Sequence, residues 1–246
     1  MATRAEFLER IRKEVGKTGG LFEASTADRS AHPEEAAEAV RRQMAERWPE
    51  ALDRFRWELE RVGGVFHRAA DPGQVPSVIL EIAREQGATA LVAWDPAALG
   101  LDLRPRLEAE GLSVAVAATD AADEAARRRH REESARAQIG VTGADWVLAE
   151  TGTVILLSGR GRPRSTSLLP DTHIAVFDRS RLVESLAQVG ILLEALHVDP
   201  ARSMSGAMIN FITGPSRTAD IELTLTRGVH GPKEVHAIFV DGGIRG

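Results

Sequence analysis

Glu150 is the residue with the clearest chemical potential, because it separates two apolar runs at 146–149 and 153–157. A carboxylate at a strand end can act as a base, a nucleophile or a hydroxyl acceptor. The adjacent Gly152 would let a substrate approach the backbone closely. A turn carboxylate that caps backbone amides is the competing interpretation, and the sequence leaves both open.

A second candidate segment is TGPSRTADIE at 213–222, which follows an apolar run. It is predicted to turn through Gly214-Pro215 and to open a helix capped by Ser216 or Thr218. A helix N-terminus presents unpaired N–H groups to an anion, and Arg217 would reinforce that site, although an ordinary capped helix fits equally. The candidate substrate- or anion-binding residues are Thr151, Gly152, Thr153, Thr213, Gly214, Pro215, Ser216, Arg217, Thr218 and Asp220.

Seven histidines are possible proton carriers, because histidine titrates near neutral pH. His173 begins an apolar run after a polar segment, and His230 lies in the rigid turn GVHGP. With Glu150, these two are the catalytic candidates. The other five are expected in structural strands (His67, His236) or at surface and helix-terminal positions (His32, His130, His197). No H-x-H or H-x-x-x-H pair occurs, so no metal site is predicted.

The composition excludes several classes of function. The chain has no cysteine, which excludes disulfides, thiol nucleophiles, zinc ribbons and thiolate-held iron–sulfur clusters. Its 31 basic and 36 acidic residues argue against a nucleic-acid binder. The apolar runs are too short to cross a membrane and the start lacks a signal-peptide pattern, so we expect a cytoplasmic chain. The arginine-rich stretch 158–167 could bind phosphate or carboxylate, or be a solvated loop.

The first 62 residues are expected to form a helical arm. Phe7, Leu8, Ile11 and Val15 lie on one face of a helix. A second helix is predicted to begin at Pro33 and to end near Trp48, before Pro49, and a third to cover 51–62.

From residue 63 to 246 the pattern predicts one α/β domain. Helices expected near 76–86, 107–111, 121–138 and 181–196 alternate with short apolar strands, which indicates a parallel sheet covered on both faces. The runs 146–149 and 153–157 are close enough for a hairpin. About eight strands in one sheet system are predicted; besides that hairpin they cover 65–67, 89–94, 113–117, 173–177, 208–212 and 235–240.

Four segments together resemble the LUD domain, and specifically the lactate utilization protein C (LutC/YkgG) group. They are GADWVLAETGTVIL (143–156), LLPDTHIAVFD (168–178), FITGPSRTADIELTLTRGVHGP (211–232) and EVHAIFVDGG (234–243). The resemblance implies a NagB/RpiA/CoA-transferase-like fold, a three-layer α/β/α sandwich. It also implies a role in oxidising L-lactate to pyruvate beside two partner proteins that carry iron–sulfur clusters, with no cofactor in this chain.

Our hypothesis for the site places Glu150, His173, the segment 213–218 and His230 in one pocket at the carboxyl edges of the strands. The helix N-terminus and Arg217 would hold a small carboxylate, and Glu150 or a histidine would handle the 2-hydroxyl proton. Two alternatives stay open. The chain could be a non-catalytic scaffold or regulatory subunit whose arm docks partners, or a CoA-transferase-like enzyme with Glu150 as nucleophile.

Overall fold

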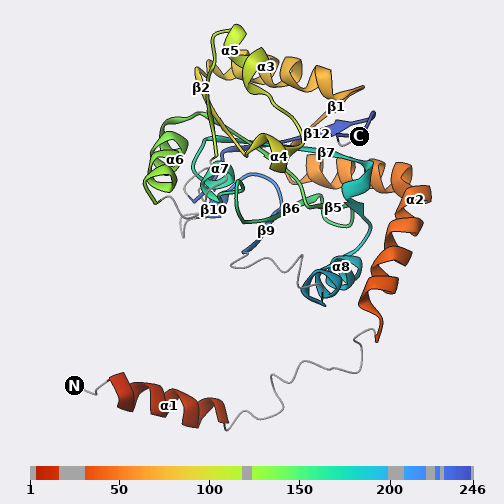
Figure 1. Ribbon diagram of the computed structural model, residues 1–246, viewed down its shortest axis with the longest axis vertical. Coiled ribbons are helices and arrows are strands. Elements are labelled where there is room, and N and C mark those ends of the chain that lie inside the picture. The colour runs from red at the N-terminus through yellow and green to blue at the C-terminus, as the bar shows by residue number, and fades with distance from the viewer. Residues whose placement is uncertain are drawn as a thin grey trace.

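A six-stranded parallel sheet forms the centre of the fold in a computed structural model of the protein (Figure 1). The structure describes residues 4–16, 31–117, 124–198, 208–219, 225–227 and 230–244. The strand order is β1-β12-β7-β4-β2-β3. The strands are β1 (Val65–Ala69), β2 (Ala90–Ala93), β3 (Ser113–Val116), β4 (Ile139–Gly143), β7 (Thr172–Asp178) and β12 (Glu234–Val240).

Helices cover both faces of this sheet, which makes a three-layer α/β/α sandwich (Figure 1). On one face lie α3 (Val75–Gln86) and α5 (Arg104–Ala109). On the other face lie α2 (Pro33–Arg61), α6 (Glu124–Arg136) and the short α7 (Ser165–Leu168). The short α4 (Pro96–Leu99) follows β2, and α8 (Leu186–Val198) packs against α2. The predicted parallel, helix-covered sheet is therefore confirmed, and β4 and β7 are buried along their whole length.

The prediction of one sheet system is wrong, because the described strands form three sheets. The second has the order β8-β5-β6-β9, and the third is the hairpin β10-β11. Their strands are β5 (Trp146–Leu148), β6 (Thr153–Leu157), β8 (Leu182–Val183), β9 (Ile209–Ile212), β10 (Arg217–Ala219) and β11 (Leu225–Arg227). The antiparallel hairpin β5-β6 is confirmed. Apolar runs predict strands but not their partners, because pairing depends on contacts that are distant in sequence.

The helix predicted to open at Ser216 or Thr218 is also wrong. Arg217–Ala219 is instead strand β10, in which Thr218 pairs with Thr226 of β11. The β-branched threonines of this segment favour extended backbone over helix. No helix N-terminus is therefore present in the described part of this segment to bind an anion.

Two further helix boundaries differ from the prediction. Pro49 does not end a helix, since α2 is continuous from Pro33 to Arg61 and changes direction along its length in Figure 1. A proline inside a helix removes one backbone hydrogen bond and bends the helix. Packing of α2 before and after Pro49 keeps the helix continuous. The helix expected to begin at residue 181 begins at Leu186, after a 3-10 turn (Arg179–Arg181) and β8.

The second half of α2 supplies a large part of the core. Phe55 and Leu59 are fully buried, and the Phe55 ring meets the Phe177 ring edge-on with centroids 5.4 Å apart. The Trp48 ring stacks on Phe239 of β12 at 5.8 Å. The division into an arm (1–62) and a domain (63–246) stays a prediction, with its boundary directly after this helix. Among the described residues, no helix has the length and apolarity needed to cross a membrane.

Candidate functional site

A pocket of about 360 Å³ opens at the carboxyl ends of β2, β4, β7 and β12. Ligands of open parallel α/β sheets bind at this edge, because the strand ends and following loops leave a crevice there. Its charged lining residues are Asp145, Arg162, Asp178, Arg179, Arg181 and Asp241.

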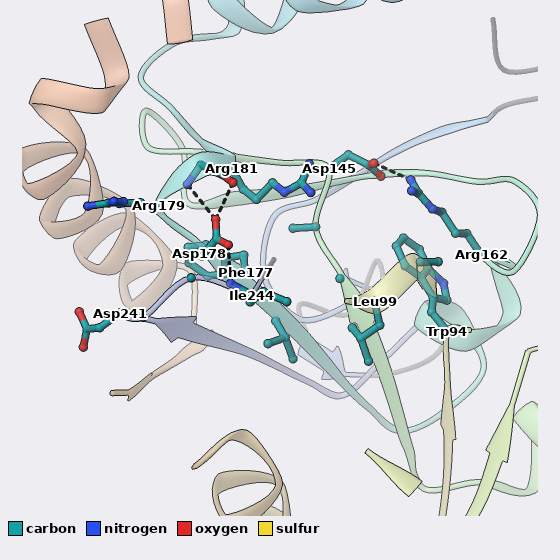
Figure 2. Close-up of a pocket in the computed structure, with 17 residues that line it drawn as sticks. Trp94, Leu99, Asp145, Arg162, Phe177, Asp178, Arg179, Arg181, Asp241 and Ile244 are labelled. Atoms are coloured by element: carbon teal, nitrogen blue, oxygen red, sulfur yellow. Dashed lines mark hydrogen bonds and ion pairs between the residues drawn. The ribbon is translucent and has the colours of Figure 1, made fainter. Parts of the chain in front are cut away.

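The ion pair between Asp145 and Arg162 forms one wall of the pocket (Figure 2). Asp145 follows β4, and its Oδ1 accepts a hydrogen bond from Arg162 Nη1 at 2.7 Å. Its Oδ2 accepts from the backbone N–H of Leu157, also at 2.7 Å. The guanidinium lies over the Trp94 ring, 5.6 Å from its centroid. The two side chains are only 13% and 24% exposed, so these contacts hold the guanidinium in one place.

Asp178 closes the end of β7 through three hydrogen bonds. Its Oδ1 accepts from the backbone N–H and the hydroxyl of Ser180, and its Oδ2 accepts from the N–H of Ile244. Burial is the strongest single influence and raises the pKa of Asp178. The bonds from Ser180 and Ile244 and the charge of Arg181 together outweigh burial, so this pKa lies below its ordinary value. Asp178 is therefore ionised at neutral pH.

The pocket lining contains arginines, whose guanidinium groups can bind an anion. Asp241 forms a two-pronged ion pair with Arg68, whose Nη2 and Nε lie 2.6 and 2.8 Å from its carboxylate oxygens. The three arginines and three aspartates of the lining balance in formal charge, and Arg68 lies outside the lining, paired with Asp241. In Figure 2, Arg181 extends across the pocket toward Asp145, whereas Arg179 points away. A small carboxylate matches the planar fork of a guanidinium.

A second, larger groove of about 1030 Å³ adjoins this pocket. It runs between the first half of α2, the second sheet and α8, and Asp145, Arg162 and Arg181 line both cavities. The pocket and the groove therefore form a continuous depression in the surface.

The LUD domain family model matches residues 52–240, which is most of the chain. This chain belongs to the LUD-domain family. Lactate utilization protein C of Halalkalibacterium halodurans is 38% identical over 68% of this chain and 70% of its own length. The protein of that name from an Exiguobacterium strain is 32% identical over 98% of this chain and 96% of its own. The chain thus lies in the lactate utilization protein C group of the LUD family.

A solved LUD-type fold agrees with the architecture. The crystal structure of a DUF162 family protein from Deinococcus radiodurans superposes with a TM-score of 0.52, covering 78% of this chain and 98% of that one. The two sequences are 21% identical, so the likeness concerns the fold alone.

The structure brings one group of predicted LUD site residues together at the C-terminal end of α2. The hydroxyl of Thr153 lies 2.7 Å from those of Thr151 and Thr213. Gly152, with φ +65°, packs so closely that a Cβ there would lie 2.3 Å from the backbone nitrogen of Leu59. These residues surround the negative end of the helix dipole, not the positive end that the anion-site hypothesis required.

The other residues of 213–220 continue this arrangement. Gly214, at φ +76°, packs against Val62, whose carbonyl accepts a hydrogen bond from Arg217. Pro215 is buried, and the N–H of Ser216 donates to the Pro232 carbonyl at 2.9 Å. Only the backbone of Thr218 is described, and Asp220 lies outside the described residues. Arg217 therefore caps the C-terminal end of α2.

The three catalytic candidates do not line the pocket at the carboxyl ends of the strands. Glu150 is exposed, and its carboxylate accepts from the N–H of Leu186 in the first turn of α8. His173 lies at the opposite end of β7, fully buried, with Nε2 2.8 Å from the Thr142 hydroxyl. His230 is exposed, two residues before Pro232. The expected placement at one carboxyl-edge pocket is therefore wrong for His173, and the catalytic roles stay predictions.

Sequence reasoning missed Asp145 and Asp178 as site residues, and it did not single out Arg162. Arg162 belongs to the arginine-rich stretch that suggested anion binding, and Asp178 directly ends a recognised strand. Asp145 was not predicted because the strand that positions it, β4 (Ile139–Gly143), has a weak strand pattern. It contains two glycines and only two large apolar residues.

His67 and His236 form a partly buried pair beside Glu234, away from the pocket. The Glu234 carboxylate only accepts, so His236 donates to it through Nε2 at 3.1 Å. Its Nδ1 therefore accepts from Nε2–H of His67, at 2.9 Å. His130, expected at the surface, is instead buried beside the Thr166 hydroxyl. Burial lowers the pKa of His173 to about 3, with a smaller contribution from the charge of His236. The same two causes lower the pKa of His67 to about 4.

These pKa values predict acid sensitivity. Unfolded histidine takes up its proton near pH 6.5, but folded His173 does so only near pH 3. The unfolded state therefore binds more protons between these values, and stability, complete above pH 6.5, falls as the pH is lowered. His173 alone should reduce the free energy of unfolding by about 2 kcal/mol between pH 7 and 5. Denaturant titrations at several pH values should show this loss. In His173→Gln the free energy of unfolding should depend less steeply on pH. The exposed control His32→Gln should keep the pH dependence of the natural chain.

Proposed function

We propose that this chain is a component of an L-lactate utilisation system and acts in the oxidation of L-lactate to pyruvate. Its place in a group whose members are named lactate utilization protein C, including a relative matched along 98% of this chain, supports that role. The observation that supports a working site is the Arg162 guanidinium, held in place by Asp145 at the wall of a pocket that Arg181 also lines. We assign this pocket the carboxylate of lactate or pyruvate.

The electrons of this reaction need an acceptor outside the chain. Oxidation of L-lactate removes two electrons and two protons, one from C2 and one from the 2-hydroxyl. The sequence contains no cysteine to hold an iron–sulfur cluster through thiolates. We therefore assign the electron transfer to partner proteins with iron–sulfur clusters, and substrate or product binding to this chain.

Binding of lactate and pyruvate to the isolated chain tests the site. The double variant Asp145→Asn/Arg162→Gln removes both charges but keeps two hydrogen-bonding side chains of similar size. It should fold and bind either carboxylate about 10- to 100-fold more weakly, because a charged hydrogen bond contributes roughly 1.5–3 kcal/mol. Titration calorimetry and ligand-dependent shifts of the melting temperature would measure this.

Two variants of the other candidate residues serve as controls. Glu150→Gln and Arg217→Ala should keep the affinity of the natural chain. If they lose binding while the double variant retains it, the site belongs to the residues around the end of α2, as the sequence hypothesis proposed.

Reconstitution tests the role in the system. Lactate-dependent reduction of a dye, measured with the iron–sulfur partner proteins, should require this chain. An unchanged rate without the chain would contradict the assignment. A chain that is required but binds neither carboxylate would support the scaffold or regulatory alternative.

A further inference from the structure

Helix α1 (Arg4–Gly16) exposes an apolar stripe to solvent. Phe7, Leu8 and Ile11 lie on one side of this amphipathic helix and are 57%, 38% and 44% exposed. Figure 1 shows α1 lying apart from the rest of the fold. A helix of 13 residues is marginal in water without packing, so its stability requires a surface that covers this stripe.

The groove beside the candidate pocket offers such a surface. Ala37, Val40 and Met44 of α2 line one side, and Leu192, Ala195 and Leu196 of α8 line another. Charged residues, among them Glu34, Glu38 and Arg41, also line the groove. A groove with both apolar and charged lining suits an amphipathic helix, which would enter through residues spaced like Phe7, Leu8 and Ile11. The volume of about 1030 Å³ can hold several large side chains.

The length of the connection between α1 and α2 limits how far α1 can lie from the groove. Only 14 residues, 17–30, separate Gly16 from the first described residue before α2. A segment of that length spans at most about 50 Å. The chain re-enters the described fold at the groove itself, because Glu34 and Ala37 of the first turns of α2 line it. Such tethering gives α1 an effective concentration near the groove in the millimolar range.

We propose that α1 docks into this groove of its own chain through Phe7, Leu8 and Ile11. The groove and the candidate pocket share Asp145, Arg162 and Arg181, so a docked α1 lies beside the pocket and narrows its opening. This inference does not depend on the identity of the ligand or on the proposed role in lactate oxidation.

The absence of cysteine from the sequence permits a direct test by crosslinking. Ile11→Cys is combined with Ala45→Cys, an exposed position of α2 that lines the groove. The control combines Ala45→Cys with Lys13→Cys, which lies about 200° further round the helix than residue 11. Under mild oxidation, the first pair should form an internal disulfide at least about tenfold faster than the control pair, given the tethering. Non-reducing gels and intact mass would measure it.

Each other outcome overturns the proposal. Equal rates for the two pairs would show that α1 has no preferred face toward the groove. A disulfide-linked dimer as the main product would assign the groove to α1 of a second copy.

Hydrogen exchange provides a measurement that needs no added cysteine. In the full-length variant Phe7→Ser/Ile11→Ser, amides of α8 (Leu186–Val198) should exchange several-fold faster than in the natural chain. Arg10→Ser/Lys13→Ser changes two polar residues of α1 as a control and should leave α8 exchange unchanged. Identical α8 exchange in the natural chain and the apolar-to-serine variant would also contradict docking.

Discussion

Gly140→Ala is expected to destabilise the protein by at least about 3 kcal/mol. Gly140 is in β4 at the middle of the parallel sheet, and a Cβ there would lie 1.8 Å from the backbone carbonyl oxygen of Thr166. This oxygen belongs to α7, which packs directly on the strand, so the clash cannot be relieved by rotating a side chain. Either α7 or β4 must move, although β4 is buried throughout and Thr166 and Ser167 of α7 are buried as well. Denaturant unfolding of the purified variant would measure the loss.

Gly190→Ala is the matched control for this substitution. Gly190 is inside α8, is exposed, and has no atom within 4 Å of an added Cβ. Alanine favours helix over glycine by roughly 0.5–1 kcal/mol, so this variant should be slightly more stable than the natural chain. A loss of less than about 1 kcal/mol in Gly140→Ala would show that α7 packs less tightly on β4 than the structure indicates.

The second large effect is expected at the pocket wall, where Arg162→Ala should cost about 3 kcal/mol. The substitution leaves the mostly buried Asp145 carboxylate without its charged partner and removes the guanidinium from the Trp94 ring. Among the described residues, the backbone N–H of Leu157 would then donate the remaining hydrogen bond to that carboxylate. Unfolding free energies at neutral pH would measure the change.

A double-mutant cycle separates the ion pair from its surroundings. If the pair contributes as the structure indicates, Asp145→Asn/Arg162→Ala should recover part of the stability lost in Arg162→Ala, because no uncompensated charge remains. A loss below about 1 kcal/mol in Arg162→Ala, the value typical of exposed ion pairs, would contradict the assignment of a fixed, partly buried guanidinium.

Local patterns predicted most of the elements in the domain. The runs around Leu91, Val154 and Phe177 are dense in branched and aromatic residues, and each became a strand. The helix α3 and its end at Gly87 followed from apolar spacing and a glycine in the left-handed conformation. These features depend on residues close in sequence, which a single sequence displays.

The pocket was not predictable in the same way, because it depends on how strands pair. Asp145 and Arg162 are 17 residues apart and meet only because the β5-β6 hairpin folds back at the edge of β4. Gly152 suggested close approach to a substrate, but the backbone of α2 at Glu58 and Leu59 occupies that space. Gly214 was expected only as part of a turn, and Val62, which directly follows α2, packs against it.

The position of β12 in the sheet has a consequence for synthesis of the protein on the ribosome. This last strand lies between β1 and β7 and is the only described neighbour of β1 in the central sheet. During translation, β1 and the side of α2 that carries Trp48 therefore lack this partner until β12 has emerged from the ribosome. Trp48 and Phe177 can contact the Phe239 ring only after β12 has emerged. A ribosome that stops before β12 therefore releases a chain in which β1 lacks its described partner strand and the apolar gap beside β7 stays open.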